Sequence, residues 1–276
     1  MRTQRSKAKN LRDYIVISVI VLALMSPYLW LICNTFRGAS EPFAASVFPR
    51  VWTLDNYKKV LTDTATFHAI RNSLLCSVTS ALLTVALAVT TAYGFSRYRF
   101  RGRKFLMTVF LCLRTFPALL LAITLFVWVV NAGLYDTYVP LVLANAMMNL
   151  PFAVWNSISI IDAVPFQVEE SGMLDGLSRL GTIFKITLPM ALPGLVATFT
   201  YVFIMSWNEY LFAMTFISSN SKQLITTKIA SAIGQFSVDY AGLLTTSAIA
   251  SVPIILLFIY IQQGIISGLS AGGVKE

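Results

Sequence analysis

Charged residues are scarce in this sequence. Only 12% of its 276 residues are Asp, Glu, Lys or Arg, while 57% are hydrophobic. Soluble domains carry about 25% charged residues, so this composition excludes an ordinary soluble domain and predicts an integral membrane protein. The net charge is +9, but the basic residues cluster beside apolar runs. That placement is typical of cytoplasmic membrane boundaries and speaks against a nucleic-acid partner.

The side chains that usually hold metals or form disulfides are equally rare. His68 is the single histidine, and Cys33, Cys76 and Cys112 all fall inside apolar runs without metal-ligand spacing. Thiols buried in lipid-facing helices behave as small hydrophobic groups, and a lone histidine is more often structural than a ligand. The sequence therefore predicts no metal site and no disulfide.

Motifs for nucleotide binding and catalysis are missing as well. The chain contains no G-x-x-x-x-G-K-[ST] loop that could cradle phosphates. It also shows no nucleophile accompanied by a base and an orienting group. We therefore expect that the chain is not an enzyme and holds no cofactor.

The most prominent feature of the sequence is its long apolar runs. Six of them reach the roughly 20 residues that a helix needs to cross a bilayer. They occupy residues 14–36, 72–95, 105–130, 137–161, 190–212 and 243–266. The expected fold is all-α, with one six-span membrane domain at 14–266 and short tails at 1–13 and 267–276. The segment at 37–71 is expected to contain a short surface helix at 55–63.

Basic residues orient these spans. The N-terminal tail and the loops at residues 97–104 and 165–189 carry most of them. Such residues concentrate on the cytoplasmic side of membrane proteins, and an even number of spans returns the chain to its starting side. Both termini are therefore expected in the cytoplasm.

The loop at residues 165–189, PFQVEESGMLDGLSRLGTIFKITLP, has helical features. Pro165 can open a helix, Gly176 can take the positive φ of a sharp turn, and Ser178 can cap a second helix. Apolar residues recur at helical spacing along the second half: Leu177, Leu180, Phe184 and Leu188. Two short helices with an apolar face would suit docking into a groove of another protein. The alternative is a generic amphipathic connector.

The pattern E-S-G-x3-G-x9-I-x-L-P, which begins at Glu170, resembles the EAA loop of the membrane subunits of binding-protein-dependent ABC importers. In that family the loop forms a coupling helix seated in a cleft of the ATP-hydrolysing subunit. The departure is Ser171-Gly172, where the family usually carries two alanines; glycine lowers helix propensity by about 1 kcal/mol relative to alanine. The resemblance implies the following ATPase-coupling residues: Glu169, Glu170, Ser171, Gly172, Leu174, Asp175, Gly176 and Arg179.

Further segments are similar to the carbohydrate branch of these importers, in particular to the maltose-type subunit. They are TLDNYKKVL at 53–61, NSL at 72–74, AYGFSRYRFRGR at 92–103, LPFAVW at 150–155, WNEYL at 207–211 and GLSAGGVKE at 268–276. The resemblance implies a type I ABC importer permease fold that moves a sugar or oligosaccharide by alternating access across a bacterial or archaeal plasma membrane. A non-sugar solute and an ion-coupled secondary transporter are the alternatives.

The same resemblance implies several partners. A second related permease would complete the pathway, two ATPase subunits would hold ATP and Mg, and an extracytoplasmic binding protein would deliver the sugar. Residues 218–223 would approach that binding protein. The tail residues expected to reach the ATPase pair are Gly272, Gly273, Val274 and Lys275.

Polar residues inside the spans are candidates for the substrate path. Arg114 lies nine residues past Phe105, about 13.5 Å into a hydrocarbon core about 30 Å thick. A charge at that depth normally faces the protein interior or a wet cavity. Family members more often carry an uncharged polar residue there. The other candidates are Asn145, Asn149, Asn208 and Glu209, with Asn156 near the same helix face as the first two.

Each of these candidates has a structural alternative. Arg114 could form an internal ion pair or bond to carbonyls at a kink beside Pro117. The asparagines could hydrogen-bond between helices, and Glu209 could anchor its span at the membrane interface.

Overall fold

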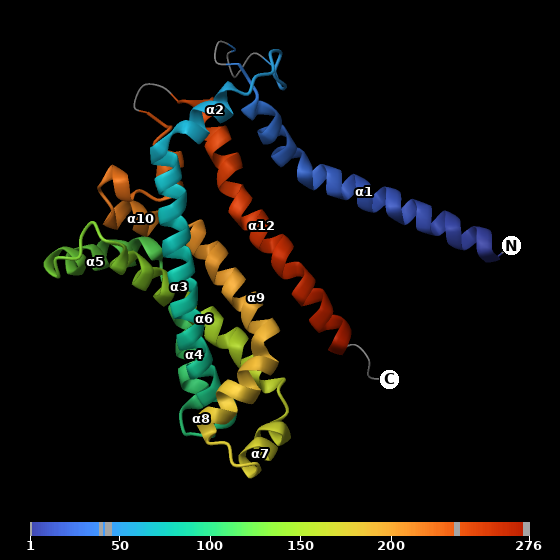
Figure 1. Ribbon diagram of the computed structural model, residues 1–276, viewed down its shortest axis with the longest axis vertical. Coiled ribbons are helices and arrows are strands. Elements are labelled where there is room, and N and C mark those ends of the chain that lie inside the picture. Colours follow the sequence, from blue (N-terminus) through green and yellow to red (C-terminus); the bar gives the residue numbers. More distant parts are fainter. Residues whose placement is uncertain (1, 39–40, 42–45, 235–237, 273–276) are drawn as a thin grey trace. The chain divides into compact units, whose positions relative to one another are not determined.

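The structure, a computed structural model, describes residues 2–38, 41, 46–234 and 238–272. Within these ranges the regular structure is helical, and extended pairing is limited to two isolated bridges. The expected all-α fold is confirmed. The helices, shown in Figure 1, are α1 (Arg2–Thr35), α2 (Asp55–Thr62), α3 (Thr64–Arg97), α4 (Arg103–Leu113), α5 (Ala118–Asn131), α6 (Tyr138–Asp162), α7 (Phe166–Leu174), α8 (Arg179–Thr182), the π-helix η2 (Ile183–Thr187), α9 (Leu188–Trp207), α10 (Leu211–Phe216), the 3₁₀-helix η3 (Asn220–Lys222), α11 (Ile225–Ala230) and α12 (Tyr240–Gly272).

The chain forms two compact units. Met1–Thr66 and Ile229–Ser251 make up the first, and Phe67–Lys228 and Val252–Glu276 make up the second. The candidate coupling loop at 165–189, the candidate substrate-path residues and the segment at 218–223 all belong to the second unit.

In the first unit, a buried arginine joins the C-terminal end of α1 to the segment that follows it. Arg37 donates to the side-chain carbonyl of Asn34 at 2.6 and 3.0 Å. Asn56 of α2 donates to the backbone carbonyls of Thr35 and Arg37, each at 2.8 Å. α2 confirms the short helix expected at residues 55–63. The apolar side chains along most of α1 are exposed, so this helix offers its surface to lipid or to another protein.

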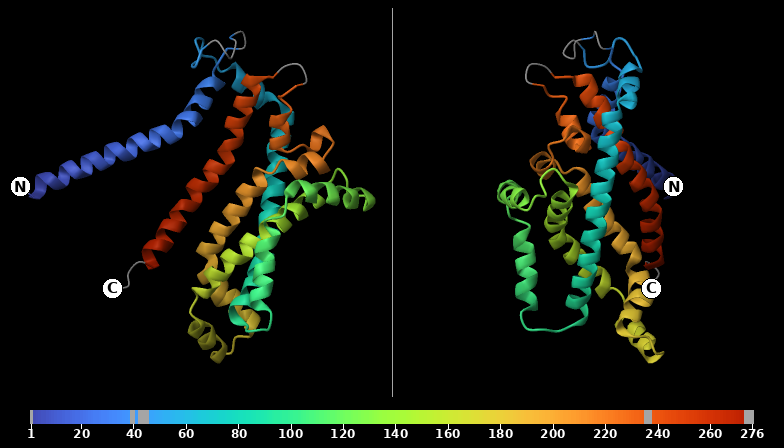
Figure 2. Two further views of the ribbon diagram at one scale, coloured as in Figure 1. Left: turned by 180° about the vertical axis from the view of Figure 1, so that it is seen from behind. Right: turned by 60° about the vertical axis from the view of Figure 1, so that its left-hand side comes forward.

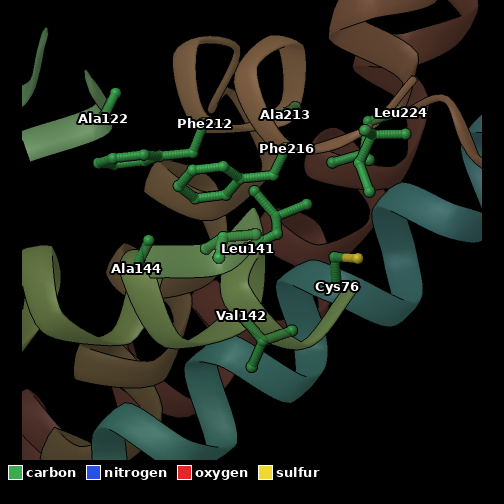
Figure 3. Close-up of a cluster of buried hydrophobic side chains, with 11 residues drawn as sticks. Cys76, Ala122, Leu141, Val142, Ala144, Phe212, Ala213, Phe216 and Leu224 are labelled. Atoms are coloured by element: carbon green, nitrogen blue, oxygen red, sulfur yellow. The ribbon is translucent and has the colours of Figure 1, made fainter. Parts of the chain in front are cut away.

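In the second unit, α6 packs against α9, and α10 packs against both α5 and α6. Both ends of this unit carry functional candidates: α7 and α8 lie at one end of α6 and α9, and α10 lies toward the other (Figures 1 and 2). A buried apolar cluster holds the α10 end together. In it, Phe212 and Phe216 of α10 lie against Leu141 of α6, with Cys76 of α3 and Ala122 of α5 beside them (Figure 3).

The third expected span is not one straight helix, which corrects the sequence-based expectation. Residues 105–130 are divided between α4 and α5, and these two helices are bent by 90° (Figure 2). Pro117 accounts for the break, because it lacks an N–H and its ring clashes with the carbonyl four residues earlier; it is the N-cap of α5. Among the described residues five other helices are long and apolar enough to cross a membrane, which gives six spans when the bent pair counts as one.

The packing of α6 on α9 depends on a glycine. A Cβ added at Gly194 would lie 2.8–2.9 Å from three side-chain atoms of Ile160. Such distances are too short for real contacts. Two of the three atoms, Cγ1 and Cγ2, are bonded to the branched Cβ of Ile160, so a change of rotamer cannot easily remove the clash. At Gly94, in α3, an added Cβ would meet nothing within 4 Å.

We therefore expect Gly194→Ala to destabilise the protein, because overpacking costs about 1–3 kcal/mol and helix propensity returns only about 1 kcal/mol. Gly94→Ala is the matched control, and it should leave stability unchanged or raise it slightly. Thermal unfolding of the two purified variants in detergent compares them. Equal midpoints for both variants would contradict the close approach.

Candidate coupling loop and substrate path

The first half of the loop at residues 165–189, called the coupling loop here, folds as its local sequence predicts. Pro165 is the N-cap of α7, and Glu169 lies in the first turn of that helix. Gly176 ends the helical stretch with a φ of +92°, a conformation that glycine adopts without steric cost. The expected helix and sharp turn are confirmed.

The second half of the coupling loop differs from the expectation. Ser178 is indeed an N-cap, and its hydroxyl accepts from the backbone N–H of Gly181 at 3.1 Å. However, α8 does not form a separate short helix, because it continues through η2 into α9 as one helical span over Arg179–Trp207. The wide π turn lies just before Pro189 and relieves the clash of its ring with the carbonyl four residues earlier. The span thus begins at Arg179 instead of near residue 190, and it ends before α10.

Glu169 is the most buried charged residue of the coupling loop, with 0% of its surface exposed. Its carboxylate accepts from Arg97 Nη2 at 2.7 Å and Nε at 3.1 Å. Thr187 of η2 donates to it at 3.0 Å, and the hydroxyl of Tyr93 donates at 3.2 Å. Four donors thus satisfy a carboxylate that would otherwise be costly to bury.

Arg97 connects the same network to a third helix. Its Nη2 also donates to the backbone carbonyls of Ile161 and Val164, each at 2.9 Å, just at and beyond the C-terminal turn of α6. A cation is favourable at that end of a helix because of the helix dipole. Arg97 and Glu169 therefore join the ends of α3, α6, α7 and the π turn at one point.

Glu169 was predicted as an ATPase-coupling residue, and the structure encloses its side chain in partners from its own chain. Any coupling role of this residue therefore acts through the network and not through an exposed carboxylate. Sequence reasoning missed Arg97, Tyr93 and Thr187, since they lie far from Glu169 along the chain. Their one local signal is that Arg97 opens the dense basic loop after the second span.

Exposed apolar side chains lie on both sides of the Gly176 turn in the coupling loop. Leu174 is 89% exposed, and Leu180 and Phe184 are also largely exposed. We call these three side chains the coupling surface. The other residues predicted for coupling that are exposed here are Glu170, Ser171, Asp175, Gly176 and Arg179.

Gly172 explains part of the departure from the family's two alanines. It is buried, and a Cβ at this position would lie 2.3 Å from Ile186 Cδ1. The missing methyl group therefore lets α7 lie directly against the side chain of the π segment. Ser171 faces outward, and its hydroxyl donates to the carbonyl of Gln167 at 2.9 Å.

Three helices converge at the break between α4 and α5. Arg114 is exposed there, and its Nη2 donates to the hydroxyl of Tyr201 in α9 at 3.2 Å. The guanidinium carbon lies 5.2 Å from the ring centre of Phe152 in α6. The Phe152 and Tyr201 rings are 4.0 Å apart. Neither an internal carboxylate nor a kink carbonyl holds Arg114, so both structural alternatives are set aside among the described residues.

Amides continue this surface along α6. Asn156 donates to the hydroxyl of Thr198 at 2.8 Å, and Asn149 donates to the carbonyl of Asn145 at 2.8 Å. Asn149 and Asn156 are half-buried and lie within one turn of Phe152 on either side. Asn145 is buried and its Nδ2 has no partner among the described residues, so it lies deeper in the helix packing.

The remaining two candidates lie apart from this surface. Asn208 is exposed and donates to the carbonyl of Ile204 at 2.8 Å. The Glu209 carboxylate accepts from the backbone N–H groups of Phe212 at 2.6 Å and Ala213 at 3.0 Å. Glu209 therefore caps α10, a helix that the apolar pattern had merged into the fifth span.

An aspartate anchors the segment expected to face a binding protein. Asp136 precedes α6, and its carboxylate accepts from the backbone N–H groups of Ser218 and Ser219 at 3.0 Å and from Lys222 Nζ at 3.0 Å. Asn72 of α3 donates to the carbonyl of Ser221 at 3.0 Å. Residues 218–223 are thus held on the ends of α3 and α6.

The family of this chain follows from its sequence. Residues 84–270 match the family model described as a binding-protein-dependent transport system inner membrane component. The chain belongs to this family. The permease is 32% identical to the inner membrane ABC transporter permease protein YcjP of Escherichia coli, with 100% of both chains covered. It is 30% identical to the trehalose/maltose transport system permease protein MalG of Thermococcus litoralis, with 96% of this chain and 97% of the relative covered.

A solved structure supports the fold of the permease. A chain from a bacterial ABC transporter involved in the import of the acidic polysaccharide alginate superposes with a TM-score of 0.76 at 18% identity. The match covers 93% of this chain and 96% of the other. The expected importer-permease fold is confirmed. Of the predicted tail residues, Gly272 ends α12, while Gly273, Val274 and Lys275 lie outside the described residues.

The buried pair yields a stability prediction. Glu169→Gln keeps the shape of the side chain but leaves the Arg97 charge buried without its counter-ion, which should cost about 3–5 kcal/mol. Glu170→Gln is the matched control. Glu170 is exposed beside Glu169, so this substitution should change stability by no more than about 0.5 kcal/mol. Thermal unfolding of the detergent-purified permease measures both. If the Glu169 variant unfolds at the wild-type temperature, the network does not hold the loop.

The Asp136 contacts yield a pH prediction. Hydrogen bonds from the Ser219 hydroxyl and N–H, then from Ser218 and Lys222, hold the pKa of Asp136 below its usual value despite some burial. A carboxyl with a depressed folded pKa stabilises above its unfolded pKa of about 3.9, and this contribution fades as the pH falls toward the folded pKa. Asp136→Asn should therefore lower the unfolding temperature at pH 7, with the difference from wild type shrinking below about pH 4. A difference independent of pH would exclude this role.

Proposed function

We propose that the permease moves a sugar or oligosaccharide into the cell as one of two related membrane subunits driven by a separate pair of ATPases. The coupling surface, Leu174, Leu180 and Phe184, carries this proposal. Three exposed apolar side chains on a polar loop suit a groove of another protein. The trehalose/maltose permease relative supports a sugar as the solute.

The coupling loop is built to transmit movement. Arg97 and Glu169 attach α7 to α3 and α6, and the π segment continues without interruption into α9. Closure of the ATPase pair on ATP would displace the coupling surface, and the attached helices would move with it. The substrate-facing helices α6 and α9 would then switch between inward and outward access. ATP favours one state only through its different affinity for the two states of the ATPase pair.

The other partners follow from the same proposal. ATP and Mg would bind to the two ATPase subunits, and the second permease would complete the pathway. Both termini would lie in the cytoplasm, where the tail Gly272 to Lys275 would reach the ATPases. On the opposite side, residues 218–223, anchored by Asp136, would meet the sugar-loaded binding protein.

An ion-coupled transporter is the alternative from another class. Such a protein needs acidic side chains within the membrane that can bind a proton or a cation. Glu209, the nearest candidate, is occupied as the cap of α10. The geometry therefore favours an ATP-driven mechanism for this permease.

The proposal is tested on the purified complex of permeases and ATPases with its binding protein. Saccharides screened one at a time should include at least one that stimulates ATP hydrolysis through the binding protein. Leu174→Glu should abolish this stimulation, because a charge replaces an exposed apolar contact without disturbing the fold. Leu61→Glu is the matched control and should keep it, because Leu61 is an exposed leucine of α2 outside the coupling loop. Full stimulation in the Leu174 variant, or transport by the permease alone on a proton gradient, would refute the proposal.

A further inference from the structure

We propose that the permease carries a sugar bearing a negative charge, such as a uronic acid, and that Arg114 with the Phe152 and Tyr201 rings binds it within the membrane. This inference rests on the proposed function of sugar import and narrows its substrate class. It also assigns the one arginine at the break between α4 and α5 a specific partner.

The break between α4 and α5 lies near the middle of the expected membrane span. The 11 residues of α4 rise about 16 Å, roughly half of a hydrocarbon core about 30 Å thick. Residues 114–117, between α4 and α5, are non-helical and all four are exposed in this chain. Irregular backbone at membrane depth occurs only where it is buried in protein or lines a water-filled cavity. An exposed guanidinium at the same place favours the cavity.

The charge of Arg114 has neutral contacts among the described residues. Among the described residues its side-chain contacts are one hydroxyl, of Tyr201, and one ring face, of Phe152. Neither carries a charge, and most of the five N–H donors of a guanidinium stay available. An arginine at this depth is costly unless a counter-charge approaches it. The planar fork of donors matches a carboxylate in two parallel hydrogen bonds.

The neighbouring side chains fit the body of a sugar. The Phe152 and Tyr201 rings pack on each other with their centres 4.0 Å apart and form an aromatic platform beside the guanidinium, and aromatic side chains line most small-molecule sites. Asn149 and Asn156, within one turn of Phe152, supply amides that can bond sugar hydroxyls. One cation beside two rings and two amides suits a polyhydroxylated molecule with a single acidic group.

Arg97, whose side chain is largely buried, differs from Arg114 in its contacts. Arg97 already has a carboxylate and two backbone carbonyls from its own chain. Arg114 has no comparable set among the described residues, so we expect its counter-charge to come from outside the chain. A carboxylate on the second permease is the competing source, and it would act on every substrate equally.

The experiment uses the complete importer in proteoliposomes with its binding protein. The probes pair neutral glucose, mannose and galactose oligosaccharides with uronic acid counterparts of equal length. We expect acidic probes to be taken up, and Arg114→Gln to lower their uptake at saturating binding protein by about tenfold or more. Uptake of any neutral probe should change less than about twofold, and Arg114→Lys should restore part of the acidic uptake because it keeps the charge.

Tyr201→Phe provides a second variant should Arg114→Gln fail to assemble. It removes only the hydroxyl that orients the guanidinium, so a loss of about two- to fivefold, confined to acidic probes, is expected. Uptake of neutral probes alone, or equal losses for neutral and acidic probes, would overturn the inference while leaving sugar import intact. If no saccharide is transported or stimulates ATP hydrolysis, the proposed function fails together with it.

Discussion

The ion pair between Arg97 and Glu169 is the contact on which the coupling-loop end of the helix bundle depends. A buried pair of this kind is weak evidence for stability by itself, because desolvation offsets much of the attraction. Its value lies in geometry: the carboxylate receives four donors, while the guanidinium also binds the end of α6. Each of these bonds requires α7 to lie in one orientation. A loop held in this way cannot swing independently, so a push on it reaches the helices behind it.

The irregularities in the fifth and third spans have opposite effects on helix continuity. In the fifth span, the π turn at η2 keeps the helix continuous past Pro189, so the second half of the coupling loop and α9 form one helical span. In the third span, Pro117 breaks the helix altogether and turns α5 by 90°. The buried cluster of α10 residues on α5 and α6 then stabilises the turned helix. Continuity thus joins the coupling loop to α9, and interruption leaves residues 114–117 non-helical and exposed.

The sequence predicted the features that depend on contacts between near neighbours along the chain, and it missed those that depend on contacts between distant residues. The cap at Ser178 and the turn at Gly176 depend on neighbours within four residues, so local patterns predicted them. Glu169 lies 72 residues from Arg97, and no pattern along the chain reports which acid meets which base. Similarly, Pro117 indicated a possible kink, but the angle depends on packing against α10. That helix was missed because Asn208 and Glu209 interrupt the apolar run only briefly, so the expected span at 190–212 ran into its first turn.

Electrostatic reasoning also separates structural charges from functional ones in this permease. A charge that the fold requires should find its counter-groups within the fold, since leaving it unpaired would destabilise every molecule at all times. Arg97 satisfies this condition and Arg114 does not. A charge left with neutral contacts at membrane depth has a cost that a counter-charge from outside the chain would offset. Where a ligand brings that counter-charge, the cost becomes affinity. The unpaired state of Arg114 is therefore better explained by intermittent occupation than by stability.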